Sequence, residues 1–202
     1  MAITIALIAL TCALSMTGFQ NRTQLERLLF WPPAVNRGEA WRLLTHGFVH
    51  ADAPHLLFNM ITLFFFGRAI EGFFTRYIGM AGYALFYLAA IVVAILPSYL
   101  AHRHDSRYRS LGASGAVSAV LFVYILIAPW STIYVFFFPL PAIVFAGLYT
   151  AYGLYAGRFG HDHINHSAHL WGAAFGVVFA LCLEPRLAGL FVERLTAPLS
   201  GG

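Results

Sequence analysis

Long apolar runs separated by short polar stretches dominate this chain of 202 residues. The expected membrane spans are residues 2–19, 55–70, 77–100, 112–128, 132–155 and 168–183. A helix needs about 20 mostly apolar residues to cross the hydrocarbon core of a bilayer. The pattern therefore predicts an all-α, six-span membrane protein in which residues 1–202 form a single domain.

The polar stretches between the runs differ in character. Residues 20–54 mix tryptophan and proline with arginine and glutamate, which is typical of a folded segment in the membrane interface. Residues 102–109 and 158–167 are predicted loops, and the tail after residue 186 is weakly amphipathic. The first apolar run lacks the basic start and the cleavage site of a signal peptide, so we expect it to be a retained span.

Composition narrows the function classes. The chain is 60% hydrophobic and only 10% charged, whereas a soluble domain carries about 25% charged residues. Its solvent must therefore be membrane lipid. All of its basic residues are arginines, and they form no basic patch with interleaved aromatics, so nucleic acid is not an expected partner. Cys12 and Cys182 lie in apolar runs and form no disulfide framework or zinc pattern.

The fourth run opens on a serine between glycines, in the order Gly112-Ala113-Ser114-Gly115. Polar groups at membrane depth are costly and are usually functional. The first turn of a helix has unpaired N–H groups and the positive end of the helix dipole, which suit a developing oxyanion beside the serine hydroxyl. The plain alternative is a helix cap.

The sixth run opens on His169, followed by Gly172 and Gly176 on the same helical face. A Gly-x-x-x-Gly face allows close helix approach. If it packs on the small residues of the fourth run, His169 would reach Ser114 and act first as general base and then as general acid. No acidic residue falls at a comparable position, so the pattern predicts a dyad. Plain helix packing is the alternative.

Two further polar residues, His55 and Asn59, lie one turn apart on the second run and share a face. Both side chains can donate hydrogen bonds. An oxyanion is one candidate acceptor, and interhelical hydrogen bonding is the other.

The remaining histidines suggest metal binding as an alternative. One set is His161, His163, His166 and His169 with Asp162, and the other is His46, His50 and His55. Neither has a spacing that fixes metal geometry. We therefore expect no metal and no cofactor.

Taken together and in order, these residues resemble the rhomboid family of intramembrane serine proteases. The resemblance rests on Trp41-Arg42, His50, His55-x-x-x-Asn59, Gly67-x-x-x-Glu71, Gly112-x-Ser114-Gly115 and Ala168-His169-x-x-Gly172-x-x-x-Gly176. It implies a six-helix bundle with a structured interfacial first loop.

The resemblance also implies roles for particular residues. Ser114 would be the nucleophile and His169 the base. His55, Asn59 and the backbone N–H of Ser114 would form the oxyanion hole. Trp41, Arg42 and Glu71 would stabilise the folded first loop, while Gly112, Gly115, Gly172 and Gly176 serve close helix packing.

One position departs from the family pattern. Many members carry a tyrosine four residues after the nucleophile, packed against the histidine, and this chain has Ser118 there. The departure puts the support of His169 in question, and a tyrosine or tryptophan from elsewhere could substitute. Trp171 faces another direction on the helix and is a poor candidate.

Orientation is predicted differently by charge and by resemblance. More arginines follow the first, third and fifth runs than the others, which by the positive-inside rule would place both termini outside. The resemblance places them in the cytoplasm. We follow the resemblance, because a folded first loop and a buried active-site loop are not ordinary short loops.

The expected function is therefore a serine endopeptidase that cleaves single-span membrane proteins within or near their transmembrane segments. Its expected location is a bacterial inner membrane. Two alternatives stay open: a catalytically inactive rhomboid-like protein that binds membrane clients, and a transporter that uses the histidines to carry metal ions.

Overall fold

The computed structural model describes residues 1–135, 137–160 and 164–197, and most of them are helical. In chain order the elements are α1 (Ala2–Gln20), α2 (Arg22–Leu28), α3 (Pro32–Asn36), α4 (Arg42–Thr45), the 3-10 helix η1 (His46–Phe48), α5 (Ala53–Thr62), the π-helical η2 (Leu63–Gly67), α6 (Arg68–His102), α7 (Ser114–Ile127), β1 (Thr132–Val135), β2 (Phe138–Pro141), α8 (Ala142–Phe159), α9 (His166–Leu183) and α10 (Arg186–Thr196).

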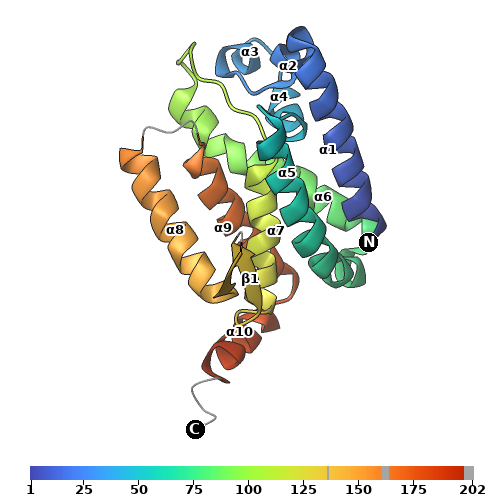
Figure 1. The fold of residues 1–202 in the computed structure, drawn as a ribbon, viewed down its shortest axis with the longest axis vertical. Coiled ribbons are helices and arrows are strands. Elements are labelled where there is room, and N and C mark those ends of the chain that lie inside the picture. Colours follow the sequence, from blue (N-terminus) through green and yellow to red (C-terminus); the bar gives the residue numbers. More distant parts are fainter. Residues whose placement is uncertain (136, 161–163, 198–202) are drawn as a thin grey trace.

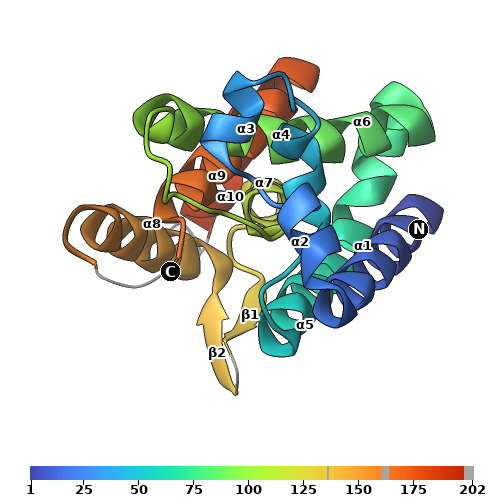
Figure 2. The same cartoon turned by 90° about the horizontal axis from the view of Figure 1, so that it is seen from above.

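Among the described residues, three helical stretches are long and apolar enough to cross a membrane: Ala2–Gln20, Ala53–His102 and His166–Leu183. The helix Ser114–Ile127 is apolar but shorter. The prediction of a helical membrane protein is thus confirmed at this level. Figure 2 shows α7 at the centre, with α1 and α5 on one side and α8 on another.

The second and third expected spans are joined differently from the prediction. We expected a polar connection over residues 71–76, but α5, η2 and α6 are continuous through this region. The break falls at Gly79, whose φ of 70° and ψ of 176° are non-helical. Only glycine adopts such a backbone at little cost, so conformational freedom and not polarity decided where the chain turns.

The fifth expected span, 132–155, is wrong in its first part. Residues Thr132–Val135 and Phe138–Pro141 pair as an antiparallel hairpin, and α8 begins only at Ala142. Pro139 and Pro141 lack the N–H that a helix interior requires. Proline is tolerated in a two-stranded hairpin because both strands are edges.

The first loop folds into the short helices α2, α3, α4 and η1 at one end of the bundle (Figure 1). Arg42 is buried there, and its guanidinium donates to Glu39 Oε2 at 2.7 Å and to the carbonyls of Glu26 and Leu29 at 2.7 and 2.8 Å. One buried arginine thus ties three parts of the loop together.

The loop is also tied to the segment that precedes α7. Phe30 and Ser110 exchange both backbone hydrogen bonds, at 2.9 and 3.1 Å. The Phe30 ring is buried against Tyr99 and Tyr108. The folded first loop therefore helps to set the position of the chain that leads to Ser114.

The expected role of Trp41 in the first loop stays a prediction, whereas the hydrogen bonds of the Glu71 carboxylate lie elsewhere. Trp41 is 54% exposed. Glu71 is buried at the start of α1, where its carboxylate accepts from the Thr4 N–H at 3.1 Å and the Thr4 hydroxyl at 2.7 Å, and pairs with the Met1 amino group at 2.6 Å. A carboxylate stabilises the unpaired N–H groups of a helix start. Glu71 therefore connects α6 to α1 and not to the first loop.

Backbone contact between α7 and α9 forms the centre of the bundle. A Cβ added at Gly172 would overlap the carbonyl oxygen of Gly115, and one added at Gly176 would overlap that of Ala119. A Cβ at Gly115 would lie 2.7 Å from Ala94 of α6. The glycines thus let three helices approach at the level of the candidate site.

Candidate active site

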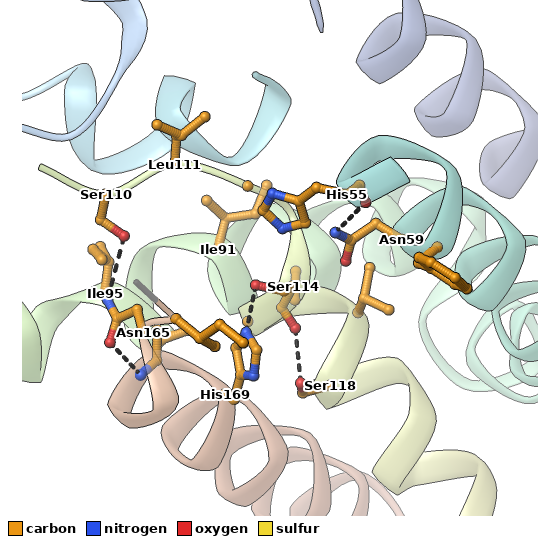
Figure 3. Close-up of a pocket in the computed structure, with 18 of the residues that line it drawn as sticks. His55, Asn59, Ile91, Ile95, Ser110, Leu111, Ser114, Ser118, Asn165 and His169 are labelled. Carbon is orange, nitrogen blue, oxygen red and sulfur yellow. Dashed lines mark hydrogen bonds between the residues drawn. The ribbon is translucent and has the colours of Figure 1, made fainter. Parts of the chain in front are cut away.

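Ser114 and His169 lie side by side at the N-terminal ends of α7 and α9. Ser114 Oγ is 2.7 Å from His169 Nε2, although the two residues are 55 positions apart (Figure 3). This is hydrogen-bond distance for a nucleophile and its base. The contact depends on the close approach of α7 and α9 just below it.

The turn into α7 requires glycine at position 112. Gly112 has a φ of +117°, and a Cβ there would lie 2.7 Å from the His55 ring. Its N–H donates to the His46 carbonyl at 2.9 Å. Ser114 follows as the first residue of α7, so its own N–H belongs to the first turn, where helical N–H groups have no intrahelical acceptor.

His50 holds the backbone directly before the serine. The ring is buried, and its Nε2 accepts from the Ala113 N–H at 3.3 Å. Nδ1 therefore carries the ring hydrogen and donates to Ser15 Oγ at 2.9 Å, while Ser15 donates to the Phe48 carbonyl at 3.1 Å. A neutral imidazole thus connects α1, the first loop and the start of α7. His50 was part of the family resemblance in the sequence, but its contact with the backbone before Ser114 was not predicted.

We expect the protein to lose stability in mild acid. Burial lowers the pKa of His50 to about 3 and the pKa of His46 to about 4, from an ordinary value of 6.5. A depressed histidine pKa means that the unfolded chain binds protons first, so stability is complete above pH 6.5 and falls as the pH drops toward 4. At pH 5 the loss should be roughly 2 kcal/mol for each histidine.

The measurement is the thermal unfolding midpoint in one detergent at pH 7.5 and at pH 5. His50→Gln keeps an acceptor near the Ala113 N–H but does not titrate. This variant should show about half of the pH dependence of the wild type. A midpoint that is equal at both pH values in the wild type would contradict the expectation.

His55 and Asn59 lie on α5 across the cavity from His169, and both face Ser114 (Figure 3). Asp52 caps the helix by accepting from the His55 N–H at 2.7 Å. Asn59 Nδ2 donates to the His55 carbonyl at 3.0 Å, and since an amide carries two hydrogens, one is left for a ligand. The His55 ring stands edge-on to His50, with centroids 4.9 Å apart.

These four side chains open into one cavity of about 690 Å³. Ser114, His169, His55 and Asn59 are among its polar lining residues, which also include Ser118 and Tyr149. The walls are largely apolar and include Phe58, Val117, Leu121 and Phe145. A space of this size and lining suits an apolar ligand that presents one polar group to the serine.

One residue of this site was missed by sequence reasoning. The ring of Tyr149, from α8, lies stacked on His169 with centroids 6.2 Å apart and planes inclined by 16°. Ser118 had suggested that an aromatic residue from elsewhere could take this place. The sequence offers many tyrosines, however, and only the packing of α8 distinguishes this one.

The structure does not form a metal site from the histidines that it describes. No group of three or more histidine, cysteine, aspartate or glutamate side chains with metal-binding geometry occurs among residues 1–135, 137–160 and 164–197. His161, Asp162 and His163 lie outside the described residues. The rings of His166 and His169 have centroids 6.1 Å apart, edge to face.

Comparison with known proteins identifies the family of this chain. The family model "Rhomboid domain" matches residues 37–186. The chain is 35% identical over 153 residues to "RHOMBOID-like protein 12, mitochondrial" of Arabidopsis thaliana, covering 70% of this chain and 46% of that protein. It is 31% identical over 161 residues to "Rhomboid protease GluP" of Bacillus subtilis, covering 80% of this chain and 29% of the relative.

A third relative is "Rhomboid protease GlpG" of an Enterobacter strain, 31% identical over 95 residues, which is 46% of this chain and 31% of the relative. The chain therefore spans less than half the length of these relatives. The family match covers most of the chain itself, and it includes the first loop from residue 37 on, both candidate dyad residues and all four glycines. This chain belongs to the rhomboid family.

Proposed function

We propose that the chain is an intramembrane serine endopeptidase that cleaves single-span membrane proteins within or near their transmembrane segments. One observation carries the proposal: the hydroxyl of Ser114 lies 2.7 Å from His169 Nε2 at the head of a cavity lined by further donors. Membership of the rhomboid family supports it, since two of the relatives are named as proteases.

The first step is attack by Ser114. His169 Nε2 accepts the hydroxyl proton while Oγ bonds to the carbonyl carbon of the scissile peptide. The carbonyl oxygen becomes an oxyanion. The Ser114 N–H, the His55 ring and the Asn59 amide are the donors that would stabilise it.

The second step releases the amine. His169 returns the proton to the leaving nitrogen as the C–N bond breaks, which leaves an acyl ester on Ser114. Water then enters, His169 accepts its proton, and the new oxyanion collapses to free the acid and restore Ser114. The protons balance between serine, histidine, water and amine, and the scheme uses no metal or cofactor.

The depth of the site determines the kind of substrate. Ser114 opens an apolar helix, and the cavity walls are apolar. A regular substrate helix hides its carbonyls in its own hydrogen bonds, so the cut should fall where small residues let the helix unwind. In this proposal the six spans are α1, the two limbs of the 53–102 stretch on either side of Gly79, α7, α8 and α9. Location in a bacterial membrane stays a prediction.

The test is cleavage by the purified protein in liposomes. A panel of single-span substrates that differ in small-residue content is incubated with it, and the cut positions are read by mass spectrometry. A serine-directed fluorophosphonate reports the nucleophile independently of substrate. We expect both cleavage and labelling, unchanged by EDTA. If the protein shows no cleavage and no labelling, the proposal is overturned. Activity that EDTA removes and zinc restores would favour the metal alternative.

Loss of an oxyanion donor should slow turnover without abolishing it. We expect His55→Ala and Asn59→Ala each to lower kcat by about 10²–10³-fold, with a smaller change in KM, because the hydrogen bond forms fully only in the transition state. The control is Leu57→Ala on the same helix, since Leu57 is 56% exposed and is not among the residues that line the cavity. Full kcat in both variants would mean that the pair only joins helices.

A further inference from the structure

Ser118 lies one turn after Ser114 on α7, and its hydroxyl is hydrogen-bonded to the Ser114 carbonyl. Its Oγ is 2.7 Å from the Ser114 carbonyl oxygen and 2.7 Å from Tyr149 Oη. A serine hydroxyl has one hydrogen, and the carbonyl can only accept. Ser118 therefore donates to the carbonyl, and Tyr149 donates to Ser118. The phenol of Tyr149 is thus connected to the backbone of Ser114 through one hydroxyl.

The same tyrosine also contacts the other half of the dyad. Its ring lies nearly parallel to the His169 imidazole, with centroids 6.2 Å apart, within the range of offset aromatic pairs. Phe122 and Phe145 pack on the ring with centroids 5.6 Å away. Tyr149 is therefore held by apolar neighbours while it touches both Ser118 and His169.

From these contacts we propose that Tyr149 is a positioning residue for the dyad, acting through its ring on His169 and through its hydroxyl on Ser118. The inference rests on the proposed function. It assigns to α8 a task that a residue of α7 cannot perform here, because Ser118 is too short to reach the imidazole with an apolar surface. The short side chain of Ser118 and the long side chain of Tyr149 are complementary in size, because they contact each other beside the dyad.

The ring and the hydroxyl make separable contributions. Tyr149→Leu removes both, and we expect kcat to fall about 10²-fold, the loss that a misplaced base typically causes, with KM within about threefold. Tyr149→Phe keeps the ring and removes the donor, so kcat should fall only about threefold to tenfold, as for one ordinary hydrogen bond. Ser118→Ala removes the other end of the same bond together with the bond to the Ser114 carbonyl, so kcat should fall at least as far. The double variant Ser118→Ala with Tyr149→Phe should be no worse than Ser118→Ala alone.

Two measurements distinguish positioning from a general loss of structure. The rate of fluorophosphonate labelling depends on the dyad and not on the peptide, so it should fall in Tyr149→Leu in parallel with kcat. Tyr155→Leu is the control, because Tyr155 lies on the same helix, is exposed, and packs only on Phe159 among the described rings. It should retain the wild-type labelling rate, kcat and unfolding midpoint.

The outcomes separate the two proposals. If the wild type neither labels nor cleaves, the proposed function fails. If the wild type does both and Tyr149→Leu labels and cleaves within threefold of it, the inference alone is overturned. Equal losses in Tyr149→Leu and Tyr155→Leu, or a rise in KM with kcat unchanged, would also overturn it, whereas recovery of activity in Tyr149→Phe relative to Tyr149→Leu supports it.

Discussion

Replacing Ser114 by alanine should abolish cleavage and fluorophosphonate labelling while the protein stays folded. The nucleophilic oxygen, which lies 2.7 Å from His169 Nε2, is lost. In a serine protease, loss of the nucleophile typically costs about 10⁶-fold in kcat. Alanine keeps the helix start, and the Ser114 carbonyl would still accept from Ser118. The variant should therefore bind substrate with nearly unchanged affinity.

The measurement is single-turnover cleavage in liposomes, with the unfolding midpoint recorded for each variant. Ser131→Ala is a suitable control, because Ser131 lies just beyond the far end of α7, where its hydroxyl donates to the Ala128 carbonyl. That variant should cleave as the wild type does. Cleavage by Ser114→Ala at even a hundredth of the wild-type rate would show that another group is the nucleophile.

Replacing His169 by alanine should be about as damaging. Without the imidazole, the Ser114 hydroxyl has no base at 2.7 Å and the leaving amine has no acid. Residues that act as a unit give non-additive losses, so Ser114→Ala combined with His169→Ala should be little worse than either alone.

The test compares kcat/KM of the two single variants and the double variant at one pH. Losses that multiply would indicate that serine and histidine act independently. His104→Ala, in the exposed loop after α6, is the matched histidine control and should leave kcat/KM unchanged. A His169→Ala variant that still labels at the wild-type rate would remove histidine from the proposed dyad.

The apolar pattern predicted most of the helices because membrane insertion depends on local hydrophobicity. The helices α1, α7 and α9 begin and end within a few residues of the expected runs. The predicted helix boundaries were wrong where the backbone properties of proline and glycine, and not hydrophobicity, determine the secondary structure. Pro139 and Pro141 produced a hairpin in an apolar run, and the helix breaks at Gly79 and not at the polar residues 71–76, where a connection was expected.

The sequence by itself determined which residues were candidates for chemistry. Ser114, His169, His55 and Asn59 are recognisable because polar side chains at membrane-helix starts are costly and rare, so each one attracts attention without a structure. Helical periodicity also predicted which glycines share a face with His169. These are local properties, and a single segment of chain carries each of them.

Only the tertiary structure decided which of these residues meet and what supports them. The 2.7 Å contact between Ser114 and His169 depends on backbone approach of α7 and α9. The contacts of Tyr149 with His169, of His50 with the Ala113 N–H and of Glu71 with the start of α1 join segments that are far apart in sequence. A partner across a helix interface is selected by packing geometry, and neither hydrophobicity nor spacing along one chain segment contains that information.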